Sequence, residues 1–538
     1  MINKIKKLIK FKDIIFVLTT ILSFYIFVYI GMPIFNYGYI GLPFISILLG
    51  IITLLFDINK TEYATLTYKK TYKSKFGFIL LIIGFIFFAI LPIGSMNVFR
   101  SSEYYKLIGN VIEKTDISDL KIPNIEDAII IDSETAYDIS YKKLVNENDT
   151  LLNNFKLDKF YLQEINNKLY YISPLLYSNS KSFNGNLISG YVMLNALDTS
   201  DFKLITNVNN YDIKLKYQTG KYGENIRRHI YNNGFKNKPF TDINFTVDDN
   251  MNPWYITSLY DKKIGYSGRE VTSVLIINPM NGHINKYDIN NVPDWVDFPH
   301  NYSIINDQIW DWCKNDNDTV NKRKTDGLHK IFNNKKKYYY TDIIDYYGKD
   351  DVSIGFIFVD TKTKETIYYK YKGITVESSI STIENLVGDK YDILIPGIYK
   401  LFGELVYFTI IKDDNKIVKY AIVNYKNGKI IGIGDNVNDA KFKYQLSLNK
   451  NGIINNDLPP VRIKIDRIGL DIINGIIYYN FTTENYPNRI FITTSNISSD
   501  IILTEKGDDI LMDFYKLDNN NKYTLKYFKN LTLNINNN

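Results

Sequence analysis

The sequence predicts an α+β protein with three N-terminal transmembrane helices, tandem modules that each combine a helix with an antiparallel sheet, and a small C-terminal β-barrel or sandwich. Three features of the 538-residue chain lead to this prediction. Uncharged apolar stretches fill much of the first 92 residues, and aromatic strand patterns recur behind polar turns. About five further strand patterns, without a clear helix, follow Pro459 and Pro460. Such alternating runs between Asn, Asp and Gly turns are typical of short strands.

Three apolar stretches, at about 14–30, 39–56 and 76–92, contain no charged residue. Each has 17 or 18 residues, and about 20 are needed to cross a hydrocarbon core of ~30 Å. Five lysines precede the first stretch, as in a cleaved signal peptide, but the stretch is long for a signal and no small-x-small cleavage site follows it. We therefore expect residues 1–94 to form a transmembrane anchor whose partner is the lipid bilayer.

Lysines flank these stretches unevenly. Five lie before the first stretch and five within 57–75, whereas the turn 31–38 has none. Because basic residues favour the cytoplasmic side, we expect a multi-pass protein of the cell membrane with a cytoplasmic N-terminus and an extracytoplasmic chain after about residue 95. Beyond position 100 the chain has 53 basic and 55 acidic residues. This balance predicts no nucleic-acid partner.

An aromatic strand behind a turn recurs along the extracytoplasmic part, marked by Tyr171, Tyr255, Tyr339, Tyr407 and Tyr478 at steps of 84, 84, 68 and 71 residues. Helix-like segments precede the first, second and fourth markers, at 134–144, 224–232 and 376–387. Recurrence at such steps is typical of repeated supersecondary units. The predicted organisation is a linker at 95–126, α+β modules at 127–210, 211–305, 306–372 and 373–455, and an all-β domain at 456–538.

The order of one helix and three strands, with an aromatic strand and a turn containing Asn, Asp or Gly, resembles the PepSY-like module over roughly residues 127–445. The whole chain is also similar to an uncharacterised family of multi-span membrane proteins from Gram-positive bacteria and their phages. Three stretches carry this similarity: Tyr222–Tyr231, Val292–Asp297 and Leu394–Tyr399. The PepSY resemblance implies inhibition or modulation of peptidases at the cell envelope, and it transfers no site residue.

The search for catalytic or metal-binding motifs assigns no catalytic residue, no cofactor and no metal ligand. A single cysteine, Cys313, and four histidines exclude an intramolecular disulfide and a cysteine-based zinc site. Cys313 lies among tryptophans, which favours packing over a nucleophilic role. The string Gly265–Arg269 lacks the closing glycine of a nucleophile elbow. The acidic turns Asp248–Asn252 and Asn315–Thr319 lack the Gly and Glu of an EF-hand loop.

One charged cluster, Glu224, Arg227, Arg228 and His229, is the candidate site for binding a partner. On a helix, Glu224 and Arg228 would be four residues apart and would form an exposed ion pair. The alternative is an edge that binds an anion or carboxylate through the planar arginine fork. Both interpretations stay open on the sequence.

The predicted function is that of a membrane-anchored extracytoplasmic protein without evident catalysis. Its tandem modules would bind or modulate an envelope protein, a peptide or a wall polymer, since arrays of modules provide surface. Two alternatives remain: a cell-envelope hydrolase that uses paired carboxylates, and an accessory subunit of a membrane sensor or transporter. The bias toward Ile, Lys, Asn and Tyr indicates a low-GC Gram-positive bacterium or its phage as the source.

Overall fold

The computed structural model describes residues 2–533 except 37, 40, 58, 61–65, 68–71, 121, 180–186, 316–321, 326, 334–335, 346–351, 451–460, 474–475 and 517–520. The chain forms two compact units. Unit 1 comprises residues 1–123 and 127–375, and unit 2 comprises residues 124–126 and 376–538. Each unit is described by itself below.

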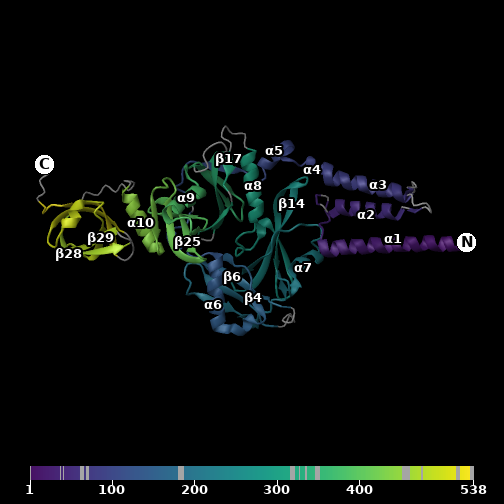
Figure 1. Cartoon of the computed structure of the whole chain (residues 1–538), viewed down its shortest axis with the longest axis horizontal. Coiled ribbons are helices and arrows are strands. Elements are labelled where there is room, and N and C mark those ends of the chain that lie inside the picture. Colours follow the sequence, from purple (N-terminus) through teal and green to yellow (C-terminus); the bar gives the residue numbers. More distant parts are fainter. Residues whose placement is uncertain are drawn as a thin grey trace. The chain divides into compact units, whose positions relative to one another are not determined.

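Unit 1 begins with apolar helices that lie side by side (Figure 1). The elements of this first part, in chain order, are α1 (Ile2–Gly31), α2 (Gly41–Asp57), the hairpin strands β1 (Asn59–Lys60) and β2 (Leu66–Thr67), α3 (Tyr72–Phe85), a π-helical turn η1 (Ile86–Ile90), α4 (Leu91–Ile93) and α5 (Asn97–Tyr105). Glycines allow α2 and α3 to approach closely, since a Cβ on Gly84 would lie 2.4 Å from Ile47. Phe27 of α1 stacks on Phe44 of α2 with ring centroids 4.7 Å apart.

The prediction of three transmembrane helices is wrong for the described residues. Only the continuous helix Lys75–Ile93, with 19 residues and a mean hydropathy of 2.9, is long and apolar enough to cross a membrane. The apolar helical segments Val17–Gly31 and Gly41–Leu54 are shorter. The second stretch is shorter than expected because the helix begins only at Gly41, so that Tyr39 belongs to the preceding turn.

Two sheets form the first part of the folded body of unit 1. The first sheet has the order β4-β6-β7-β8, with β5 also paired to β6, and α6 precedes it. The second has the order β13-β14-β15-β16. Their elements are α6 (Ser133–Leu152), β4 (Phe155–Leu157), β5 (Tyr161–Ile165), β6 (Lys168–Tyr177), β7 (Tyr191–Asn195), β8 (Phe202–Ile205), β13 (Asn244–Val247), β14 (Pro253–Ile264), β15 (Ser267–Ile277) and β16 (Ile284–Asp288).

The two sheets share one hydrophobic core. Tyr170 and Tyr191 from the first sheet pack in the same buried cluster as Phe245, Tyr255 and Leu275 from the second. The short elements between the sheets are β9 (Asn207–Val208), β10 (Tyr211–Asp212), β11 (Tyr217–Gln218), β12 (Glu224–Asn225) and α7 (Ile226–Asn232). Since each sheet completes the core of the other, they are not two separate modules.

The third sheet of unit 1 has seven strands in the order β17-β19-β20-β21-β3, with β18 paired to β19 and β22 paired to β20. Strand β3 comes from the segment 95–126 and pairs in parallel with β21. Helix α8 packs on this sheet through Ile305, Ile309 and Trp312. The elements are β3 (Val111–Lys114), η2 (Ile125–Asp127), η3 (Ile289–Asn291), α8 (Tyr302–Lys314), β17 (Lys322–Lys324), β18 (His329–Asn333), β19 (Lys336–Asp345), β20 (Val352–Asp360), β21 (Thr366–Tyr369) and β22 (Gly373–Ile374).

Unit 2 contains one sheet flanked by helices and a barrel. The sheet has the order β23-β25-β26-β27, with β24 paired to β25. Gly432 and Gly434 lie where α10 crosses β27, and a Cβ on Gly432 would lie 2.2 Å from the carbonyl oxygen of Ala440. The Gly-x-Gly sequence is thus a packing feature. The elements are α9 (Val376–Val387), β23 (Asp392–Ile393), β24 (Gly397–Leu401), β25 (Glu404–Asp413), β26 (Lys416–Asn424), β27 (Ile431–Gly434) and α10 (Val437–Lys450).

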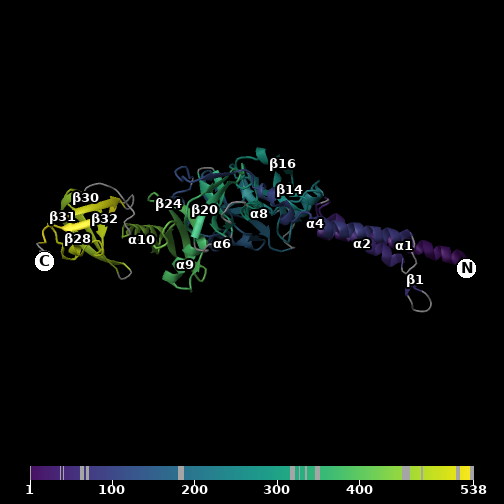
Figure 2. The same ribbon diagram turned by 90° about the horizontal axis from the view of Figure 1, so that it is seen from above.

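The C-terminal strands close into a barrel in the order β28-β29-β30-β32-β31, with β30 and β32 parallel (Figure 2). The sequence left a barrel and a sandwich open, and the chain forms the barrel. Its core is aromatic, with Phe491 fully buried against Phe481, Phe514 and Tyr523. The elements are β28 (Val461–Ile473), β29 (Ile476–Thr483), β30 (Tyr486–Thr493), η4 (Ser499–Leu503), β31 (Asp509–Lys516) and β32 (Lys522–Asn530).

The predicted array of repeated helix-plus-sheet modules is also wrong. The described sheets differ in strand number and order, and β3 enters the third sheet from an earlier part of the chain. Along the chain, α9 precedes the sheet of unit 2 and α10 follows it. The first four recurring tyrosines therefore mark an inner strand of each open sheet, and Tyr478 marks a strand of the closed barrel, rather than an independent repeated domain.

The aromatic core of the barrel gives a stability prediction. Phe491→Ala removes a fully buried ring, and we expect the free energy of unfolding of the barrel to fall by about 3–5 kcal/mol because a cavity remains. Ile472→Ala is the control, since Ile472 is 69% exposed, and we expect its effect to stay within about 0.5 kcal/mol. Denaturant unfolding followed by tyrosine fluorescence measures both. Equal effects of the two substitutions would contradict the assigned core.

Candidate functional site

A polar pocket of about 570 Å³ lies in the body of unit 1. The tight turn between β5 and β6 forms one wall, where Asn166 and Asn167 adopt positive φ angles of 50° and 63°. Asparagine tolerates this conformation at little cost, which is why it suits the turn. The described lining residues are Pro123, Asp127, Glu164, Asn167, Lys168, Leu169, Asn195, Leu197, Phe332 and Asn333.

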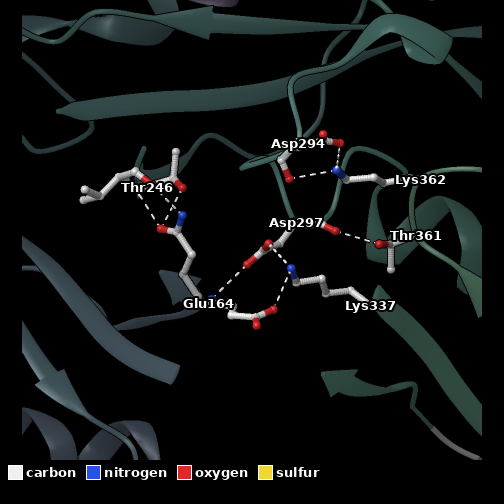
Figure 3. Close-up of polar contacts among 9 residues, drawn as sticks. Glu164, Thr246, Asp294, Asp297, Lys337, Thr361 and Lys362 are labelled. Atoms are coloured by element: carbon white, nitrogen blue, oxygen red, sulfur yellow. Dashed lines mark hydrogen bonds and ion pairs between the residues drawn. The ribbon is translucent and has the colours of Figure 1, made fainter. Parts of the chain in front are cut away.

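A buried ion cluster supports this wall (Figure 3). The ammonium nitrogen of Lys337 lies 2.7 Å from Oε2 of Glu164 and 3.0 Å from Oδ1 of Asp297. The backbone N–H of Glu164 donates to Oδ2 of Asp297 at 3.0 Å. The side chains of Lys337, Glu164 and Asp297 are only 7%, 13% and 5% exposed. The cluster therefore joins β5, β19 and the loop that precedes α8 through charges shielded from water.

Electrostatics keep the lysine of this cluster charged. Burial alone would lower the pKa of Lys337, but the adjacent Asp297 and Glu164 carboxylates outweigh it and hold that pKa above its usual value. Burial raises the pKa of the Asp297 carboxyl, against the opposing pull of Lys337. A lysine kept protonated in this way has no free lone pair, so it does not suit nucleophilic or Schiff-base chemistry.

The loop that contributes Asp297 is fixed on several sides. Thr361 donates its hydroxyl to the carbonyl oxygen of Asp297 at 2.6 Å, and Lys362 pairs with Asp294 at 2.9 Å (Figure 3). Ser258 of β14 donates to the carbonyl oxygen of Pro299 at 2.7 Å. Because this loop contacts strands or turns of all three sheets of unit 1, it places Asp297 with little freedom.

The pocket presents hydrogen-bonding groups more than an acid–base pair. Among the described lining residues, carboxylates come from Asp127 and Glu164, and Glu164 is already paired with Lys337. Asp297 lies behind the wall and does not line the pocket. Glycosidases use two carboxyl groups that both face the scissile bond. This arrangement thus favours the binding of a polar molecule over hydrolysis by paired carboxylates.

The predicted partner-binding residues lie elsewhere, at α7. Glu224 belongs to β12 and precedes the helix, whose N-cap is Asn225, so Glu224 and Arg228 do not form the expected helical pair. Arg228 donates to the carbonyl oxygen of Tyr29 at 2.6 Å and lies over the Tyr29 ring. Nε2 of His229 lies 2.7 Å from the carbonyl oxygen of Gly282.

Arg227 is exposed, and its guanidinium lies 4.9 Å from the centroid of the Phe240 ring. The structure thus brings Arg227 and Arg228 together on one helix and uses Arg228 to hold the end of α1. Their binding of an external partner stays a prediction.

The weaker sequence motifs have structural explanations. Gly265–Arg269 spans the tip of the β14–β15 hairpin, where Gly265 and Gly268 have positive φ angles of 55° and 69°. Cys313 is buried in the core beside Trp312. Oδ1 of Asp248 accepts backbone N–H groups from Asn250 and Asn252, as in a closed Asx turn. Of the second acidic turn, residues 316–319 lie outside the described part of the chain.

Within the described residues, no group of three or more His, Cys, Asp or Glu is placed to hold a metal ion. Sequence reasoning missed Glu164, Lys337 and Asp297 as a set. Asp297 ends the stretch Val292–Asp297, and nothing in that stretch points to Glu164 or Lys337.

The ion cluster gives a second prediction. Lys337→Met leaves two buried carboxylates without their cation, and we expect the free energy of unfolding to fall by about 3–5 kcal/mol. Lys362→Met is the matched control, because it removes an exposed pair with Asp294 and should cost at most about 1 kcal/mol. Denaturant titration of the full chain compares them. A small effect of Lys337→Met would show that water reaches the cluster.

Comparison with known proteins gives no family. No family model matches the chain, and no curated protein matches it. Two mutants of Bacillus megaterium levansucrase align with 12% identity and TM-scores of 0.18, covering 75% and 79% of this chain and 97% and 94% of theirs. A Trypanosoma rangeli sialidase bound to the inhibitor DANA aligns with 9% identity and a TM-score of 0.16, covering 70% of this chain and 55% of its own. Likeness at these TM-scores carries no conclusion about fold or activity.

Proposed function

We propose that this chain is a membrane-attached protein whose folded body lies outside the cytoplasm and binds a polar ligand of the cell envelope. The observation that carries the proposal is the pocket of about 570 Å³ beside Glu164 and Lys337. Its volume falls in the range of sites that hold small ligands, roughly 300–1,000 Å³. The rigid ion cluster behind its wall keeps the wall in place before a ligand arrives.

The exposed apolar side chains of the helix Lys75–Ile93 support attachment to a membrane. Phe76, Ile82 and Phe85 are 55%, 58% and 61% exposed. Only 11% of the most apolar window is buried inside the protein. At 1.5 Å per residue such a helix is about 28 Å long, close to the thickness of a hydrocarbon core. A lipid bilayer would remove these exposed apolar side chains from water.

The flanking charges support an extracytoplasmic body. Lys73 and Lys75 lie in the first turn of α3, whereas the first charged residue after Ile93 is Arg100, which pairs with Glu103 at 2.6 Å. The positive-inside tendency then assigns the lysine-rich end to the cytoplasm. One crossing with this polarity leaves residues after about 95 on the outer side.

The lining of the pocket supports a ligand rich in hydroxyl and amide groups. Asn167 and Asn333 present amides, Lys168 presents an exposed ammonium, and Glu164 presents a carboxylate. Phe332 adds an apolar surface. Groups of this kind bind the hydroxyls and ring faces of saccharides. We therefore propose a short glycan of the cell wall as the ligand.

Cysteine labelling of intact cells tests the orientation. In a Cys313→Ala background, Asn290→Cys should react with a membrane-impermeant maleimide, because Asn290 is exposed on the body. Ser74→Cys, beside Lys75, should react only after the cells are permeabilised. The opposite pattern, or a chain recovered without membranes, would refute the proposed location.

Titration of the full chain with soluble wall-glycan fragments, followed by calorimetry, tests the pocket. We expect Lys168→Ala to weaken binding roughly tenfold, since a hydrogen bond from a charged group is lost. Lys286→Ala, at an equally exposed strand position away from the pocket, should bind like the unmodified chain. If the unmodified chain gives no heat of binding, or if both variants behave alike, the glycan proposal fails.

A further inference from the structure

The folded body of unit 1 is attached directly to the end of the apolar helix. Ser95 follows that helix by two residues, and its hydroxyl oxygen accepts the backbone N–H of Tyr266 at 2.9 Å. The carbonyl oxygen of Ser95 accepts the hydroxyl of Tyr104 at 2.6 Å. The tip of the β14–β15 hairpin is therefore level with the point where the helix Lys75–Ile93 ends.

The turn between α1 and α2 lies at the same level and also contacts the body. Pro43, near the start of α2, lies beside Gly84 of α3, so the two helices are antiparallel and this turn is near Ile93. Lys262 of the hairpin donates to the carbonyl oxygen of Gly38 at 2.8 Å. The hydroxyl of Tyr231, on α7, donates to the carbonyl oxygen of Pro33 at 2.8 Å.

Positive charge gathers on the body at this junction. We define the juxtamembrane basic surface as Arg227, Arg228, Lys236, Lys262 and Lys263. None of the five forms an ion pair with a described carboxylate. Asp261 pairs with Lys238 at 2.5 Å and Asp307 pairs with Arg269 at 2.6 Å. Two further carboxyl groups lie nearby: Glu224 is exposed, and Asp311 lines a cavity together with Lys262. The five cations of the surface outnumber these two acids.

Aromatic rings hold several of these cations in place. The guanidinium of Arg228 lies 4.3 Å from the centroid of the Tyr29 ring, and the ammonium of Lys262 lies 4.2 Å from that of Tyr39. Tyrosine and basic side chains together are the residues that proteins place at the level of lipid headgroups. Directly beside them on α1, Tyr25 is 62% and Ile30 71% exposed, which continues the apolar surface of the membrane helix.

A small cavity at this surface contains an available arginine. It has a volume of about 240 Å³ and is lined by the end of α1 and the following turn, by Arg227 and Tyr231 of α7, and by Phe240 and Tyr260. Arg227 is exposed and makes no ion pair with a described residue. Its planar guanidinium group can donate hydrogen bonds to two phosphate oxygens at once. The apolar walls suit the carbon atoms that adjoin a lipid phosphate.

We propose that the juxtamembrane basic surface binds the phosphate groups of anionic phospholipids in the leaflet that faces the body, with Arg227 as the main phosphate ligand. The inference rests on the membrane attachment proposed above and is independent of the glycan pocket. Continuity with the apolar helix favours a lipid over a soluble anion, because the phosphate of a lipid would lie at this height already. The bound headgroups would fix the tilt of the body on the membrane.

Native mass spectrometry of the full chain in detergent tests the proposal. The protein is titrated with phosphatidylglycerol or with phosphatidylcholine of the same acyl chains, and the lipid bound per chain is counted. We expect a preference for phosphatidylglycerol that falls roughly a hundredfold in the triple variant Arg227→Gln, Lys236→Gln, Lys263→Gln, since each surface cation contributes about a fivefold effect. The control triple variant Lys142→Gln, Lys156→Gln, Lys286→Gln changes the net charge equally at exposed positions elsewhere.

Each outcome of this experiment either supports or overturns the proposed binding of anionic lipids. Equal binding of the two lipids by the unmodified chain overturns the proposal, and this result does not depend on the folding of any variant. An equal loss of the preference in both triple variants overturns it as well. Abolition of the preference by inorganic phosphate would assign the surface to a soluble anion and would overturn it too. If cysteine labelling shows an inserted chain that has no lipid preference, only this inference fails; a chain that is not inserted removes the proposed attachment itself.

Discussion

The body of unit 1 depends on one buried cation. Lys337 lies between Glu164 and Asp297 at 2.7 and 3.0 Å, and these three residues come from three separate segments of the chain. Burying a charge is costly unless partners compensate for the lost water. Two carboxylates around a single ammonium satisfy that condition only when all three segments are in place. The cluster therefore specifies how the first sheet, the third sheet and the loop between β16 and α8 fit together.

The same constraint explains why the polar pocket has a defined shape. Glu164 belongs both to the ion cluster and to the pocket wall, so the wall is fixed by interactions behind it. Preorganised walls lose little conformational entropy when a ligand binds. A second junction, at Ser95 and the α1–α2 turn, fixes the body to the helix Lys75–Ile93 through direct hydrogen bonds. The body is thus held at short range, without a long linker between it and the apolar helices.

Local patterns in the sequence predicted single elements well. The helix expected at 376–387 is α9. The strand patterns after Pro459 and Pro460, with no clear helix among them, predicted a small all-β domain but left a barrel and a sandwich open, and the chain forms the barrel. These features depend on residues within one or two turns of chain, where periodicity and turn chemistry carry the information.

Long-range packing was beyond the sequence patterns. Tyr171 and Tyr255 recur at a step of 84 residues, which suggested separate modules, but the sheets that contain them share one core. Glu164 and Asp297 are 133 residues apart, and nothing local to either marks Lys337 as their partner. The arginines of α7 were singled out as candidates for binding a partner, which stays a prediction, and periodicity could not show that Arg228 would hold the end of α1. The start of the second apolar helix was also placed too early, at 39 instead of Gly41, because Tyr39 carries no charge that would mark it as outside the helix.

The closure of the C-terminal barrel has a consequence for encounters with other chains. Every strand from β28 to β32 has a hydrogen-bonded neighbour on each side over part of its length, so among its described residues the barrel lacks an edge strand that is unpaired along one whole side. Strand exchange between copies and β-augmentation by an extended peptide both need such an edge strand. Recognition at this end of the protein must use side chains and loops, which confines it to partners of matching surface shape.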